Sequence, residues 1–124
     1  MNDLIGIPYV YGGRDPARGL DCVGLLEVVL HRLGIPFSPP ALDVQHAKEI
    51  LRAIEQQQRS PVWQEVAPTE IQTGDVALLG RHHVGVLIDG GVIHTCKGFG
   101  VCIQSPIMLQ LSCYPSTRWY RYCG

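Results

Sequence analysis

The stretch "GLDCVGLLEVVL" (residues 19–30) places a cysteine where an amphipathic helix is expected to begin. Apolar residues recur at helical spacing from this point, and polar residues take the other side. The apolar face consists of Cys22, Leu25, Leu26, Val29, Leu30 and Leu33. Gly34 and Pro36 then end the pattern, so we expect a helix over 22–33.

The position of Cys22 in this helix has a chemical consequence. The first N–H groups of a helix have no internal partners, and the helix dipole adds partial positive charge there. Asp21, which precedes the cysteine, is a suitable N-cap residue. A thiolate at this point is stabilised, so we expect the pKa of Cys22 to lie below the ordinary value of about 8.5. Position alone leaves two interpretations open, a nucleophile and a small buried core residue.

The composition is that of one folded domain over residues 1–124. The chain is 46% hydrophobic and 17% charged, with ten basic and eleven acidic residues. This balance gives no basic patch for nucleic acid, and no apolar run approaches the roughly 18 residues of a membrane helix. The start "MNDLIGIPYVYGG" lacks a basic segment and a long apolar core. We therefore expect synthesis in the cytoplasm without a signal peptide, and no membrane insertion.

The cysteines indicate neither a disulfide framework nor a metal site. Their number is five, which is odd, and a reducing compartment disfavours disulfides. Cys96 and Cys102 flank a glycine-containing turn and could face each other across two strands. No CxxC pair is present, so the spacing does not fit zinc. We expect no metal and no cofactor.

The second half of the chain changes from helical to strand patterning. A second helix is expected over 43–57, bracketed by prolines. Strands are expected over 63–66, 75–80, 82–88, 92–96, 101–105 and 118–123. Helices followed by hairpin-linked strands predict an α+β fold, with N-terminal helices packed on an antiparallel sheet of about five to six strands.

A cysteine nucleophile needs a histidine base, and that base needs an orienting group. His82, His83 and His94 lie on adjacent expected strands. Strand alternation places His83 on the face of Gly85, where the missing side chain leaves a gap for a helix end. We therefore choose His83 as the base in preference to His82.

The turn between these strands decides whether His94 can orient His83. A two-residue turn on Asp89-Gly90 puts His94 opposite Gly85, on the face of His83. Diagonal neighbours of this kind lie about 7–8 Å apart, within reach of long side chains. Other turn registers would separate the rings or move His94 to the wrong face. Two unrelated strand histidines remain the alternative.

Taken together, these motifs resemble the NlpC/P60 cysteine peptidases, which cleave the peptide stems of bacterial peptidoglycan. The matching motifs are Tyr9, Gly12-Gly13, Asp21-Cys22-Val23-Gly24-Leu25, Gly74-Asp75-Val76, His83-Val84-Gly85-Val86 and Ile93-His94. They occur in the family's order, and the resemblance covers residues 4–105. Two features depart from the family pattern. Val23 replaces the usual serine, and the hairpin between the histidines is about one residue shorter.

The resemblance implies a papain-like NlpC/P60 fold and a set of roles for its residues. Cys22 would be the nucleophile, His83 the general base and His94 the group that orients His83. The Tyr9 hydroxyl would lie near Cys22 and could bind the oxyanion together with the Cys22 N–H. Simple packing beside the glycine pair is the alternative for Tyr9. The reaction implied is amide cleavage through an acyl-enzyme, at the bond between D-γ-glutamate and a diamino acid.

A narrower resemblance suggests a biological setting. "IPYVYGGRDPARGLDC" (7–22) and "RWYRY" (118–122) are similar to tail-associated members of the family from long-tailed phages. This implies phage tail proteins as partners besides peptidoglycan stem peptides, and a place in the virion tail. Two alternatives stay open. One is a bacterial housekeeping wall hydrolase, and the other is a non-catalytic structural tail protein or binding module.

Overall fold

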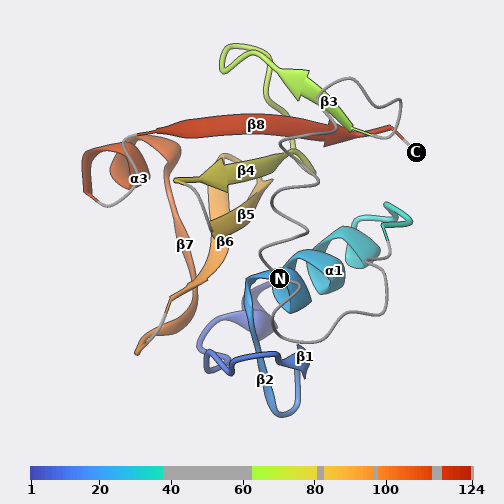
Figure 1. Cartoon of the computed structure of the whole chain (residues 1–124), viewed down its shortest axis with the longest axis vertical. Helices are drawn as coiled ribbons and strands as arrows, with labels where there is room; N and C mark the ends of the chain where they lie inside the picture. Colours follow the sequence, from blue (N-terminus) through green and yellow to red (C-terminus); the bar gives the residue numbers. More distant parts are fainter. Residues whose placement is uncertain (38–62, 81–82, 97, 113–115, 124) are drawn as a thin grey trace.

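The computed structural model describes residues 1–37, 63–80, 83–96, 98–112 and 116–123, without the side chains of Cys96 and Ser112. The elements are η1 (Asn2–Leu4), β1 (Arg14–Asp15), β2 (Gly19–Leu20), α1 (Cys22–Arg32), β3 (Trp63–Val66), β4 (Val76–Leu79), β5 (His83–Ile88), β6 (Gly91–Cys96), β7 (Gly100–Gln104), α3 (Pro106–Ser112) and β8 (Thr117–Tyr122). The expected α+β class is confirmed (Figure 1). The helix expected over 43–57 lies outside the described residues. Within the described parts, no helix has the length and apolar character needed to span a membrane.

The main sheet has six strands in the order β3-β8-β4-β5-β6-β7, and every pairing is antiparallel. All six strands expected from the sequence are present, with small differences at their ends. The last strand, β8, lies between β3 and β4 rather than at an edge (red in Figure 1). This placement buries Trp119 and Tyr120 on its two faces.

The two faces of the sheet carry separate apolar clusters. Helix α1 packs against β5 and β6, and its residues Leu26 and Val29 share one cluster with Val84 and Val86. On the other face, Leu109 of α3 packs with a cluster that contains Leu87, Val92 and Trp119. Helix α3 was not expected from the sequence, because seven residues are too few to show a helical period.

The beginning of α1 is fixed by a cap and by a close contact between backbones. The Gly24 N–H donates to Asp21 Oδ1 at 2.7 Å, which confirms Asp21 as the N-cap. The Asp21 N–H donates to Gly13 O at 3.1 Å. A Cβ on Gly24 would collide with that same carbonyl oxygen. The helix therefore starts directly against the loop that precedes it, which sets the position of Cys22.

The β5–β6 hairpin has the register that the sequence predicts. Val86 pairs with Ile93 and Ile88 with Gly91, so the turn residues are Asp89 and Gly90. Both have positive φ, 48° and 85°, as a type I′ turn requires. Continued by one step, this register places Gly85 opposite His94.

Candidate active site

Cys22 is the first residue of α1 and is half-buried, with its sulfur near the start of β5. The backbone N–H groups of Val23 and Val84 are oriented to hydrogen bond a thiolate at this position. Val84 directly follows His83 in β5. The start of the helix and the histidine end of the strand therefore meet at one place.

The pKa of Cys22 is raised to about 11, so the expectation of a lowered value is wrong. The largest cause is burial of the thiol, and the second is the negative charge of Asp21. The two N–H groups and the Arg14 guanidinium act in the opposite direction without reversing the shift. Removal from water thus outweighs the stabilisation by the helix N-terminus. At neutral pH Cys22 is a thiol, and a base must take its proton during any reaction.

The structure brings His83 and His94 together. Nε2 of His83 lies 3.0 Å from Nδ1 of His94. The rings meet edge to face, with an interplanar angle of 76° and centroids 5.2 Å apart. His94 is fully buried, whereas His83 is partly exposed. The predicted diagonal contact between the two side chains is therefore confirmed.

The space beside Gly85 has a different use from the one expected. A Cβ on Gly85 would lie 2.6 Å from Val92 Cγ1 and 3.2 Å from His94 Cβ. The space beside Gly85 is thus filled by β6, and the prediction that a helix end approaches there is wrong. Glycine lets β6 come close enough for the His94 ring to reach His83. His82 lies outside the described residues.

Both imidazoles are held in the neutral form at neutral pH. The pKa of His83 is lowered to about 4, first by burial and then by the charge that His94 would carry. The pKa of His94 is also lowered by burial, which the hydrogen bond to Gln104 partly opposes. A neutral His83 can accept a proton, which is what a general base needs.

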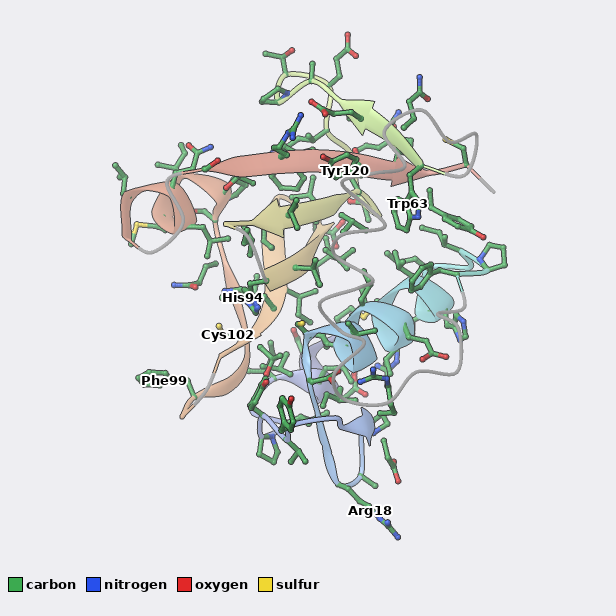
Figure 2. All side chains as sticks on the ribbon, in the orientation of Figure 1. Arg18, Trp63, His94, Phe99, Cys102 and Tyr120 are labelled. Atoms are coloured by element: carbon green, nitrogen blue, oxygen red, sulfur yellow. The ribbon has the colours of Figure 1, made fainter. Side chains whose placement is uncertain are left out.

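Gln104 joins this group and was not anticipated from the sequence. Its Oε1 lies 2.7 Å from His94 Nε2, and the Cys102 Sγ lies 3.6 Å from the same nitrogen. Figure 2 shows His94 and Cys102 side by side where β6 and β7 pair. The β6–β7 register could have revealed the contact, because Cys102 pairs with His94 and Gln104 lies two residues further along the same face.

The β6–β7 register also shows how Cys96 and Cys102 lie relative to each other. Cys96 pairs with Gly100 and Cys102 pairs with His94. The two cysteines are therefore not directly opposite each other, unlike the arrangement that the sequence suggested. Among the described residues, Cys22, Cys102 and Cys123 are free thiols. The described part of the chain contains no cluster of three or more groups that could bind a metal.

Tyr9 lies within electrostatic range of the cysteine. Its backbone forms a parallel bridge with Leu20, just before the start of α1. The pKa of Tyr9 is raised, first by burial and then by the negative charge that Cys22 would carry when ionised and the charge of Asp21. The phenol therefore keeps its proton at neutral pH and can donate a hydrogen bond toward the site.

Comparisons with known proteins identify the family of this chain. The model of the NlpC/P60 family matches residues 6–109. The chain is similar to the gamma-DL-glutamyl hydrolase of Bacillus subtilis (strain 168), with 36% identity over 94 residues that cover 70% of this chain and 19% of that protein. It thus spans only a small part of that relative's length.

Two solved structures share the fold. The NlpC/p60 domain of the peptidoglycan hydrolase SagA matches with a TM-score of 0.58 and 23% identity, covering 94% of this chain and 89% of that one. An NlpC/P60 family protein from Bacillus cereus ATCC 10987 matches with a TM-score of 0.62 and 23% identity, covering 98% of this chain and 37% of that one. With the match to the family model, these findings show that the chain belongs to the NlpC/P60 family.

Proposed function

We propose that this domain hydrolyses an amide bond in the peptide stem of bacterial peptidoglycan, with Cys22 as nucleophile and His83 as general base. The observation that carries the proposal is the hydrogen bond between His83 and His94. It lies next to Val84, whose backbone N–H faces the Cys22 sulfur. Membership of the NlpC/P60 family supports the same substrate class.

The contact between His83 and His94 supports Nδ1 of His83 as the atom that acts as the base in this proposal. Nε2 of His83 faces His94, so Nδ1 remains to take the thiol proton. The sulfur then attacks the amide carbon, and the negative charge collects on the former carbonyl oxygen. The Cys22 N–H belongs to the first helical turn, which has no internal acceptor, and can bind this oxygen together with the Tyr9 hydroxyl.

The second half of the reaction returns the enzyme to its starting state. Protonated His83 gives its proton to the departing amine as the carbon–nitrogen bond breaks, which leaves a thioester on Cys22. Water then attacks the thioester carbon while His83 takes a proton from that water. The carbon–sulfur bond then breaks and His83 returns the proton to the sulfur, which gives the free thiol and a carboxylic acid that ionises to carboxylate. His94 keeps the His83 ring oriented throughout.

The bond that we propose is the one between D-γ-glutamate and a diamino acid. The similar protein from Bacillus subtilis is named as a γ-DL-glutamyl hydrolase, which supports a γ-glutamyl acyl group. We further propose a phage tail as the setting, with other tail proteins as partners. The support for this setting is the resemblance of residues 7–22 and 118–122 to tail-associated members.

Digestion of purified peptidoglycan tests the reaction. The wild type should release fragments with a new γ-glutamyl carboxylate and a new amine on the diamino acid, identified by mass. Cys22→Ala should release none, while Cys102→Ala should match the wild type. A γ-linked glutamyl oligomer without a diamino acid serves as a second substrate. Its cleavage or resistance shows whether the leaving amine must belong to a diamino acid. Binding of peptidoglycan without cleavage would favour the non-catalytic binding module.

A separate experiment tests the setting. Mass spectrometry of purified phage particles and of tail-assembly intermediates from the source genome should detect the chain. Its absence from both, together with its presence in the cell envelope, would favour a bacterial housekeeping hydrolase.

A further inference from the structure

Two side chains of β7 lie near His94 Nε2, and one is a strong acceptor while the other is a thiol that donates or accepts only weakly. The acceptor is the amide oxygen of Gln104 at 2.7 Å, and the thiol is that of Cys102 at 3.6 Å. An amide oxygen can only accept, so a hydrogen bond of this length places the proton on His94 Nε2. The Cys102 sulfur is weak both as a donor and as an acceptor, so it does not determine where this proton lies.

The tautomer of the His94 ring determines the state of His83. With the proton on Nε2, Nδ1 of His94 accepts from the His83 Nε2–H, and His83 Nδ1 is left unprotonated. With the proton on Nδ1, His94 would donate to His83 Nε2 and leave the only ring proton of His83 on Nδ1. In that second state His83 could not take a proton from Cys22.

We infer that Gln104 is a positioning residue that fixes His94 in the Nε2–H tautomer and thereby keeps Nδ1 of His83 open toward Cys22. The inference rests on the proposed function. Gln104 on β7 is the third residue of a hydrogen-bonded series that runs from His83 on β5 through His94 on β6. Burial of His94 strengthens the preference, because water cannot replace the lost acceptor.

The spectroscopic test observes the tautomer directly. In protein labelled with ¹⁵N-histidine, long-range ¹H–¹⁵N spectra should show that His94 is protonated at Nε2 in the wild type. In Gln104→Met the new side chain is similar in length to glutamine, but its sulfur is only a weak acceptor. This variant should shift the His94 proton toward Nδ1. Gln104→Leu provides a second variant if the first does not fold. Cys102→Ala removes the other neighbour and should retain the wild-type pattern.

The kinetic test separates positioning from structural damage. Gln104→Met should lower kcat by about tenfold, the size of one buried hydrogen bond, and leave KM unchanged. Gln104→Glu keeps an acceptor and should keep the tautomer. Its negative charge would raise the pKa of His94, whose titratable neighbours include His83 on β5 and Cys102 on β7. The acid limb of kcat should therefore move to higher pH, because protonated His94 cannot accept from His83.

The spectra decide the matter whether or not peptidoglycan is the substrate. If His94 stays protonated at Nε2 in folded Gln104→Met, the inference is wrong. A normal tautomer shift without any hydrolysis by the wild type would contradict the proposed function alone. Equal losses of kcat in Cys102→Ala and Gln104→Met would also count against a specific role for Gln104.

Discussion

His83 and His94 are eleven positions apart in the chain, yet Nε2 of one lies 3.0 Å from Nδ1 of the other. The contact depends on the two-residue turn at Asp89 and Gly90, since any other register would move His94 along or across the sheet. It also depends on Gly85, where a side chain would push His94 away. The base of the proposed reaction is therefore oriented by local features of a single hairpin.

Replacement of the two histidines should affect the rate unequally. His83→Ala should lower kcat by about 10²–10⁴-fold, the usual contribution of a general base. His94→Gln should lose less, because a glutamine can still accept from His83 Nε2. Steady-state kinetics on a defined stem peptide provides the measurement. His82→Ala is the control, and strand alternation in the sequence predicts little effect on the rate. A larger loss at His82 than at His83 would show that the base is misassigned.

The rate should stay high well into the acid range. The proposed base acts in its neutral form, and the pKa of His83 is lowered to about 4 because the ring is buried. Activity should be present above this pKa and lost as the pH falls through about 4. The pH profile of kcat/KM checks this in the free enzyme. An acid limb near the ordinary histidine value of about 6.5 would show that His83 is more solvated than the structure indicates.

The alkylation of Cys22 should increase with pH without levelling off near neutrality. The thiolate reacts with iodoacetamide, and the pKa of this thiol is raised to about 11 by burial and by Asp21. Rates measured by peptide mass mapping should therefore rise up to about that pH. A plateau below pH 8 would instead support a thiolate stabilised by the helix N-terminus.

A variant of the cap residue tests the cause of this shift. Asp21→Asn keeps a side-chain oxygen for the Gly24 N–H and removes the negative charge beside the sulfur. The pKa of Cys22 should fall, and its alkylation at a fixed mildly alkaline pH should become faster. Asp15→Asn removes a charge from an exposed position on β1 and should leave the rate unchanged. If both variants behave alike, Asp21 has no specific effect on the thiol.

Local signals in the sequence predicted most of the framework and the contact between His83 and His94. The start of α1 followed from Asp21 and its helical period, and the β5–β6 register followed from Asp89 and Gly90. Placement of β8 between β3 and β4 depends on pairing of distant segments, which no local pattern specifies. The pKa of Cys22 was predicted with the wrong sign, because helix position is visible in the sequence and burial is not. Gln104 was missed for a similar reason, since its role appears only once β7 is paired with β6.

The ion pair between Arg121 and Asp75 should contribute more to the free energy of unfolding than the exposed ion pair of Arg118 on the same strand. Arg121 donates from Nε and Nη2 to the two carboxylate oxygens of Asp75 at 2.8 and 2.9 Å, and Asp75 is 1% exposed. Arg121→Met would leave that buried carboxylate without its cation, so the free energy of unfolding should fall by about 3 kcal/mol. Urea denaturation measures the change.

The same strand offers a matched control for this pair. Arg118 forms an ion pair with Glu65 in which both side chains are roughly half exposed. Arg118→Met should lower the free energy of unfolding by less than about 1 kcal/mol, because water already screens such a pair. Equal effects at the two arginines would mean that burial of Asp75 does not govern the contribution of Arg121.

Tyr9 provides a test of the oxyanion interaction that is independent of the base. Its hydroxyl keeps its proton because burial, the charge that Cys22 would carry when ionised and the charge of Asp21 raise its pKa. If it donates to the oxygen that becomes negative in the transition state, Tyr9→Phe should lower kcat by about 10²-fold. KM should change little, since the contact strengthens only as the charge develops. Tyr11→Phe is the control, because that ring is 67% exposed and lies two residues away. A wild-type kcat in Tyr9→Phe would mean that the ring only packs against the loop, and that the oxyanion is stabilised by backbone N–H groups alone.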